Sequence, residues 1–222
     1  GLTDVKLPLG MAYFYADHLP AIVKLMAPLL WFIPTGNSDK SLPYIQTVIA
    51  TEGPYADAAR FIYSDLIAQQ APELMPEAIQ TLQGLTKRYP MNPRLHLALI
   101  ASYAYSDQWR AAYDALEPLR LNVDTDSAFQ NIGHIWAVYS LKYLKQPIPQ
   151  DIEKALLAIE PPDIPGWAMD WFTLAQGLVL DFQQNRPGAI EKYQTVIASE
   201  NNFNSGWLLD LAKTGLDEPL FT

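Results

Sequence analysis

Five short stretches of the chain share one spacing, in which a small residue is followed four positions later by an apolar or aromatic one. Seven positions after the small residue, four of the stretches carry another apolar residue (Val48, Leu85, Leu119 and Val196), and the fourth has Pro162 there. Positions i, i+4 and i+7 share one face of an α-helix, and a small residue on that face lets a second helix approach closely. The pattern predicts the second helix of a repeated helical hairpin. The pairs are Ser41/Ile45, Ala78/Leu82, Ala112/Leu116, Ala155/Ile159 and Ala189/Tyr193.

An internal repeat supports this interpretation, because residues 46–50 (QTVIA) recur letter for letter at 194–198. Turns rich in proline and glycine separate the short stretches from longer apolar ones. No alternating run bounded by hairpin turns competes with them, so we expect almost no sheet. The predicted fold is all-α, with about five helical hairpins and a terminal helix. The longer helices are expected at about 55–69, 93–106, 126–145, 166–184 and 203–214.

Composition removes several classes of function. The chain has 222 residues, 15 Lys+Arg against 24 Asp+Glu, a net charge of −9 and no cysteine. An acidic chain without a basic run is not expected to bind nucleic acid or anionic lipid, which need clustered positive charge. The lack of cysteine excludes disulfides, thiolate zinc sites and thiol nucleophiles.

The same composition favours a periplasmic or exported location slightly over a cytoplasmic one. Because the chain begins at Gly1, we expect that a leader has been removed or that the sequence starts inside a longer gene. The most apolar segment, residues 19–34, is about 24 Å long as a helix and is interrupted by Lys24 and Pro28. A bilayer core needs about 30 Å. We therefore expect a buried helix broken at Pro28 and no membrane insertion.

Two regions resemble the tetratricopeptide repeat family, whose unit is a helical hairpin of 34 residues. The resemblance implies a single repeat domain over residues 1–222, divergent in 1–70 and clearer in 71–222, built as a right-handed α-solenoid. It also implies that the first helices line a concave face that binds peptides. The residues that carry it are Pro76 to Ile79, Lys87 to Pro90, Asn92, Pro93, Leu95 to Ala98, Tyr103, Ala112 and Leu116 in one unit, and Gly177, Ala189, Tyr193 and Trp207 in the other.

Motifs for catalysis or metal binding are absent from the sequence. The three histidines lie in different segments; His18 is expected to be a solvated residue at a helix end, and a structural role is expected for His96 and His134. Residues 124–127 lack the glycine and the distal glutamate of a calcium loop and are interpreted as a helix cap. There is no phosphate-binding glycine loop, nucleophile elbow or His-Glu-x-x-His. We expect no enzyme activity, no cofactor and no metal.

Aromatic residues are abundant, with 6 Trp, 12 Tyr and 8 Phe, and many lie in the long helices. The segment 166–184 is apolar around more than half of its helical circumference. Either neighbouring repeats cover it on both flanks, or part of it forms the concave binding face that the resemblance implies. By position, that face would comprise Arg94, Leu97, Ala101, Tyr105, Trp171, Leu174, Leu178, Asp181 and Phe182.

The function expected from these features is that of a non-catalytic helical-repeat scaffold. Its partner would be a protein or peptide segment, in a bacterial envelope or regulatory assembly. The alternative is a small-ligand or enzyme-accessory module, in which an aromatic pocket around Trp136 and Trp171 holds an apolar or sugar-like ligand. A hydrolase on a closed helical toroid is disfavoured, because 222 residues supply too few helix pairs.

Overall fold

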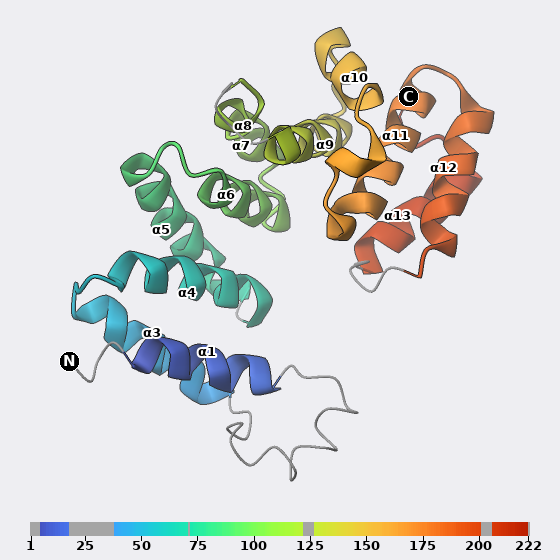
Figure 1. Ribbon diagram of the computed structural model, residues 1–222. Helices are drawn as coiled ribbons and strands as arrows, with labels where there is room; N and C mark the ends of the chain where they lie inside the picture. The colour runs from blue at the N-terminus through green and yellow to red at the C-terminus, as the bar shows by residue number, and fades with distance from the viewer. Residues whose placement is uncertain (1–4, 18–37, 71, 122–126, 201–205, 222) are drawn as a thin grey trace. The chain divides into compact units, whose positions relative to one another are not determined.

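The computed structural model describes residues 5–17, 38–70, 72–121, 127–200 and 206–221. All regular structure in these ranges is helical, without a strand, which confirms the all-α prediction. The chain forms two compact units, Gly1–Tyr89 and Pro90–Thr222. The division falls at the start of the segment 90–93 that the sequence places between helices. Each unit is described separately below (Figure 1).

The first unit packs its helices in the order in which the chain makes them. α1 lies against α3, α3 against α4, and α4 against α5 (Figure 1). The approach of α1 to α3 depends on Gly10, since a Cβ atom there would lie 2.9 Å from Cγ1 of Ile45 and 3.1 Å from the carbonyl oxygen of Ser41. The elements are α1 (Lys6–Asp17), α3 (Ser38–Ala50), α4 (Ala56–Gln70), the 3-10 turn η2 (Pro72–Leu74) and α5 (Met75–Arg88).

The second unit is organised around one long helix, α9 (Ser127–Leu144), which contacts α6, α7, α8, α10 and α11. Three consecutive residues of α9, Ala137 to Tyr139, are fully buried, as expected of a helix covered on all sides. The other elements are α6 (Pro93–Tyr105), α7 (Trp109–Asp114), α8 (Glu117–Leu121), α10 (Gln150–Leu157), η3 (Pro161–Asp163), η4 (Gly166–Ala168), α11 (Met169–Phe182), α12 (Arg186–Ala198) and α13 (Gly206–Asp217).

The predicted inner face of the short helices is confirmed in four of the five cases. Ser41, Ala78, Ala112 and Ala189 are fully buried, and so are the residues four and seven positions after each of them. The prediction is wrong for α10, where Ala155 is only half-buried. There the buried set is Ile152, Leu156 and Ile159, which keeps the same spacing three residues earlier in the chain.

The third short helix also differs from the expectation, because it is broken in two. α7 ends at Asp114 and α8 begins at Glu117. The cause is Pro118, which has no N–H to donate and whose ring would clash with the carbonyl group of Asp114. Leu116 and Leu119 remain buried, so the break changes the backbone and not the packed face.

Three long helices of the second unit end in the same turn. α6, α9 and α11 are each followed by a non-glycine residue with left-handed φ, and the amide after that residue donates to a carbonyl five positions back. This is the Schellman arrangement. The left-handed residues are Asp107, Lys145 and Gln184, with φ of 56°, 53° and 61°, and the bonds are Gln108 to Tyr103 (2.9 Å), Gln146 to Leu141 (3.0 Å) and Asn185 to Leu180 (2.8 Å). The helices α6, α9 and α11 therefore end alike.

At the end of the chain, the ring of Tyr193 is held between two helices that approach it through glycine. A Cβ atom at Gly177 of α11 would lie 2.5 Å from Cε1 of this ring, and one at Gly215 of α13 would lie 2.7 Å from Cδ2. The Tyr193 hydroxyl reaches the buried carboxylate of Asp181. These contacts join α11, α12 and α13 into one packed group.

The carboxylate of Asp181 accepts four hydrogen bonds. Tyr193 donates at 2.7 Å and the Leu220 amide at 2.8 Å, both to Oδ2, and Nη1 of Arg186 lies 3.1 Å from Oδ1 and 3.4 Å from Oδ2. Nη2 of Arg186 donates to the carbonyl oxygen of Leu216 at 3.1 Å. Burial, together with the hydrogen bond to Asp181, raises the pKa of Tyr193 far above its usual range. The network ties the last residues of the chain to α11.

Among the described residues, no helix combines the length and the apolar character that crossing a membrane requires. The apolar segment 19–34, His18 and the predicted cap at 124–126 lie outside the described residues.

Candidate aromatic ligand-binding pocket

Rings from four helices of the second unit form one continuous aromatic cluster. Trp136 of α9 and Trp171 of α11 have ring centroids 5.4 Å apart, and Trp171 stacks on Trp207 of α13 at 5.3 Å. On the other side, Trp109 of α7 stacks on Tyr143 of α9 at 4.1 Å, and Tyr143 stacks on Trp207 at 6.0 Å. Such ring pairs stabilise a fold beyond the area that they bury.

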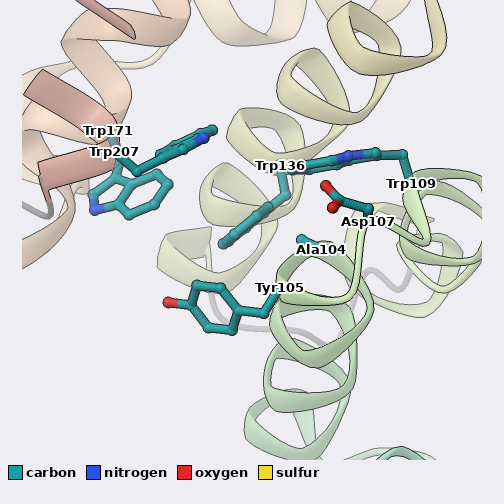
Figure 2. A pocket seen from close by; sticks show the side chains of 7 residues that line it. All are labelled: Ala104, Tyr105, Asp107, Trp109, Trp136, Trp171 and Trp207. Atoms are coloured by element: carbon teal, nitrogen blue, oxygen red, sulfur yellow. The ribbon is translucent and has the colours of Figure 1, made fainter. Parts of the chain in front are cut away.

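A pocket of about 230 Å³ opens beside this cluster, and Figure 2 shows the side chains that line it. Its inner wall includes Trp136, which is 9% exposed, whereas Trp207 is 36% and Tyr105 is 65% exposed. The pocket therefore runs from the packed interior to the surface. We call it the tryptophan pocket; its lining residues are Ala104, Tyr105, Asp107, Trp109, Trp136, Trp171 and Trp207.

The central helix fixes the inner wall of the tryptophan pocket. Trp136, Tyr139 and Tyr143 follow one another at spacings of three and four residues, so they project from one side of α9. The Tyr139 hydroxyl donates a hydrogen bond of 2.8 Å to the carbonyl oxygen of Trp171. Burial raises the pKa of Tyr139 well above its usual value, so the hydroxyl stays protonated and keeps donating. This bond links α9 to the first turns of α11 and so positions Trp171.

Among the described lining residues, the one carboxylic acid is Asp107, at the turn that follows α6. Its backbone is held by two hydrogen bonds, from its own amide to Ala104 at 3.0 Å and from the Gln108 amide to Tyr103 at 2.9 Å. Burial is the main reason why the pKa of the neighbouring Tyr143 is raised, and the negative charge of Asp107 adds to it. The carboxylate is therefore held close to the aromatic cluster by a defined turn.

The residues expected on a concave face are divided by the structure. Tyr105 and Trp171 both line the tryptophan pocket. Arg94, Leu97 and Ala101 lie nearer the N-terminus of α6 and are not among its lining residues. The other four belong to α11: Leu174, Leu178 and Asp181 are buried inside the unit, and half-buried Phe182 packs against Phe221 at 5.4 Å. Most of the apolar excess of α11 is therefore core.

Two of the tryptophans in the pocket, Trp109 and Trp207, were not expected there, and neither was Asp107. Trp136 and Trp171 had been placed together as a possible ligand pocket, on the basis of their aromatic helices. No sequence spacing predicts that Trp109 and Trp207 lie close together, because they belong to α7 and α13. Both side chains line the pocket only because α7 packs against α9 and α13 packs against α11.

The histidines of the described residues lie outside this pocket. His96 is buried, and its Nε2–H donates to the carbonyl oxygen of Pro90 at 2.8 Å, which fits a structural role. His134 of α9 has a buried Nδ1 without a hydrogen-bond partner. Burial and the positive charge of Arg120 lower the pKa of His134, against the opposing effect of Asp151. Within the ranges that the structure describes, no three His, Asp or Glu side chains are grouped so as to hold a metal ion.

No family model, no curated protein and no solved structure matches the chain. Function is therefore inferred from the tryptophan pocket and the helices that build it.

Proposed function

We propose that the chain is a non-catalytic helical-repeat protein of tetratricopeptide type, which binds a segment of a partner protein through the tryptophan pocket. The single observation that carries this proposal is the meeting of four tryptophans and one tyrosine in a pocket that reaches the surface. Tryptophan and tyrosine contribute most to binding energy at protein interfaces. Tyr105 and Trp207 keep exposed aromatic surface at the rim, and exposed apolar patches are typical of interaction sites.

The repeat class is supported by the helices themselves. The inner face is buried with the predicted spacing in four short helices, and three long helices of the second unit end in the same hydrogen-bond pattern. In proteins of this architecture each hairpin packs on its neighbours, and the first helices present side chains to partners. Tyr105 and Trp171 belong to two such first helices, α6 and α11.

The size of the pocket favours one side chain of a partner segment over a large ligand. Pockets for drug-sized ligands hold about 300–1,000 Å³, whereas the tryptophan pocket has about 230 Å³. An anchoring side chain would enter it, and the rest of the segment would lie across the exposed rim formed by Tyr105 and Trp207.

A second candidate is a small apolar or sugar-like ligand. Its supporting observation is the pair Trp171 and Trp207, stacked with an interplanar angle of 28° at one wall of the pocket. Flat indole faces of this kind bind apolar ring faces by dispersion and burial.

Peptide selection followed by affinity measurement tests the proposal. Seven-residue peptides displayed on phage are selected against the full chain, and their affinities are measured by tryptophan fluorescence and calorimetry. Tyr105→Ala removes an exposed ring of the rim and should weaken the selected peptides about tenfold or more. The matched control is Tyr55→Ala, another exposed tyrosine, which lies in the first unit. The proposal fails if peptides bind both variants equally; binding of disaccharides in place of peptides would favour the second candidate.

A further inference from the structure

The lining residues that the structure describes in the tryptophan pocket combine electron-rich rings with one acid and no base. Four indoles and one phenol ring supply the walls, Asp107 supplies the charge, and no lysine, arginine or histidine is among the seven lining residues. A purely apolar ligand would leave the carboxylate without a role, and an anionic ligand would be repelled by it. The lining therefore has the chemistry of a site for a positive charge.

The carboxylate of Asp107 is exposed and available. In the part of the chain that the structure describes, the ion pairs involve other acids: Glu52, Asp57, Asp151, Asp181 and Asp210. Figure 2 shows Asp107 beside Trp109, with Trp136 between it and the pair Trp171 and Trp207. A cation beside the carboxylate would thus lie next to the indoles of Trp109 and Trp136.

The turn that holds Asp107 does not itself require an acid. The same left-handed position is occupied by Lys145 after α9 and by Gln184 after α11. These turns have the same hydrogen-bond pattern. Backbone geometry therefore explains why a residue is fixed at this place, but it does not explain why that residue carries a negative charge beside the pocket.

The aromatic cluster already accepts a cation at another ring. Nζ of Lys142 lies 4.2 Å from the ring centroid of Tyr143, which stacks on both Trp109 and Trp207. A cation within about 6 Å of a ring centroid is attracted by the negative face of the ring, most strongly for tryptophan. The net charge of −9 also draws cations toward the molecule.

We infer that the tryptophan pocket recognises an organic cation, held by the carboxylate of Asp107 and by the indole rings that line the pocket with it. This inference rests on the proposed binding function and deepens it. The cation is an alkylammonium or guanidinium group, and two sources share that chemistry: a free small molecule, or a lysine or arginine side chain of the partner segment. A strongly hydrated metal ion is not the ligand, since the walls offer it few oxygen atoms.

Two probes of equal shape separate charge from size. Choline carries a quaternary ammonium, and 3,3-dimethylbutan-1-ol has the same shape without the charge. Titration of the full chain, followed by tryptophan fluorescence, should show choline bound about tenfold more tightly than the alcohol. Tripeptides Ac-Gly-Arg-Gly-NH2 and Ac-Gly-Lys-Gly-NH2 test the second source in parallel. Tighter binding of choline points to a free ligand, and tighter binding of a tripeptide points to a partner side chain; either supports the inference.

Asp107→Asn tests the carboxylate itself. Asparagine tolerates left-handed φ as well as aspartate does, so the turn is kept and only the charge is lost. This variant should bind the best cationic probe about three- to fivefold more weakly and leave the affinity for the alcohol unchanged. The matched control is Asp114→Asn, an exposed acid of α7 that does not line the pocket.

Several results would overturn the inference: equal affinity for choline and the alcohol, unchanged cation affinity in Asp107→Asn, or no binding of any cationic probe. These outcomes are distinct from failure of the proposed function. If selected peptides bind in a manner that depends on Tyr105 but not on Asp107, the pocket is a peptide site and the occupant is not cationic.

Discussion

The hydroxyl of Tyr193 donates a 2.7 Å hydrogen bond to Oδ2 of Asp181, whose side chain is 1% exposed. The same carboxyl group pairs with Arg186, whose Nη1 lies 3.1 Å from Oδ1. Hydrogen bonds to charged groups contribute more to stability than neutral ones, and a buried carboxylate loses much when a donor is removed. The pair is therefore a main stabilising contact between α11 and α12.

Tyr193→Phe should lower the free energy of unfolding by about 1.5–3 kcal/mol, because it removes only the donor to Asp181. The ring stays in place between Gly177 and Gly215. Urea unfolding followed by tryptophan fluorescence measures the effect, since five of the six tryptophans belong to the second unit. As a control, Tyr55→Phe alters an exposed ring and should change stability by less than about 0.5 kcal/mol. Equal effects of the two substitutions would contradict the assigned role.

Gly177→Ala is expected to destabilise the second unit by about 1–3 kcal/mol through overpacking. The added methyl group would lie 2.5 Å from Cε1 of Tyr193, a ring that Gly215 confines from its other side. Gly84→Ala is the matched control, because the new Cβ in α5 meets nothing within 4 Å. Alanine is the better helix former, so that variant should gain up to about 1 kcal/mol. Thermal unfolding by circular dichroism distinguishes the two, and a neutral Gly177→Ala would refute the close contact.

These contacts show which parts of the fold could be predicted from the sequence. The prediction that a small residue lies on the buried face is confirmed for Ser41, Ala78, Ala112 and Ala189. Such periodic burial can be predicted because it follows from the spacing of apolar residues within one helix. Ala155 was misplaced, since both Ala155 and Ile152 fit a helical face and only packing against α9 and α11 decides between them. Pro118 is a helix breaker that the sequence shows, but the break between α7 and α8 that it causes was not among the expectations.

The pocket was less predictable than the helices. Trp136 and Trp171 could be suspected from their aromatic helices, but Trp109, Trp207 and Asp107 reach the pocket from segments far apart in the sequence. Their meeting depends on how α7 and α13 pack, which no local pattern encodes. In α11, Asp181 was expected on a concave binding face but is buried. Its hydrogen-bond partners Arg186, Tyr193 and Leu220 explain why a carboxyl group is tolerated there.

Gln184→Gly should stabilise the second unit by about 0.5–1 kcal/mol. Gln184 has φ 61°, a left-handed conformation in which a Cβ atom is unfavourable and glycine is not. The substitution leaves the backbone bonds of the turn unchanged, from Gln184 to Asp181 and from Asn185 to Leu180. Gln183→Gly is the paired control: φ there is −77°, so glycine adds flexibility to the unfolded chain, and it also removes the hydrogen bond from the Gln183 side chain to Glu153; both effects should destabilise. Chemical denaturation of both variants gives the test, and a gain at position 183 but not at 184 would contradict it.

Acid should lower the stability of the folded chain through His134. Burial and the charge of Arg120 lower the pKa of His134 from its usual value of 6.5, so the folded chain keeps the ring neutral where the unfolded chain would protonate it. Between those two pKa values the unfolded state binds more protons, so stability rises with pH and falls as the pH drops below about 6.5. His134→Gln removes the titrating group and should flatten this dependence between pH 7.5 and 5.5, a window above the main titration of carboxylates. Urea midpoints across the window measure it. A variant that loses stability as steeply as the parent chain would show that the acid sensitivity arises elsewhere.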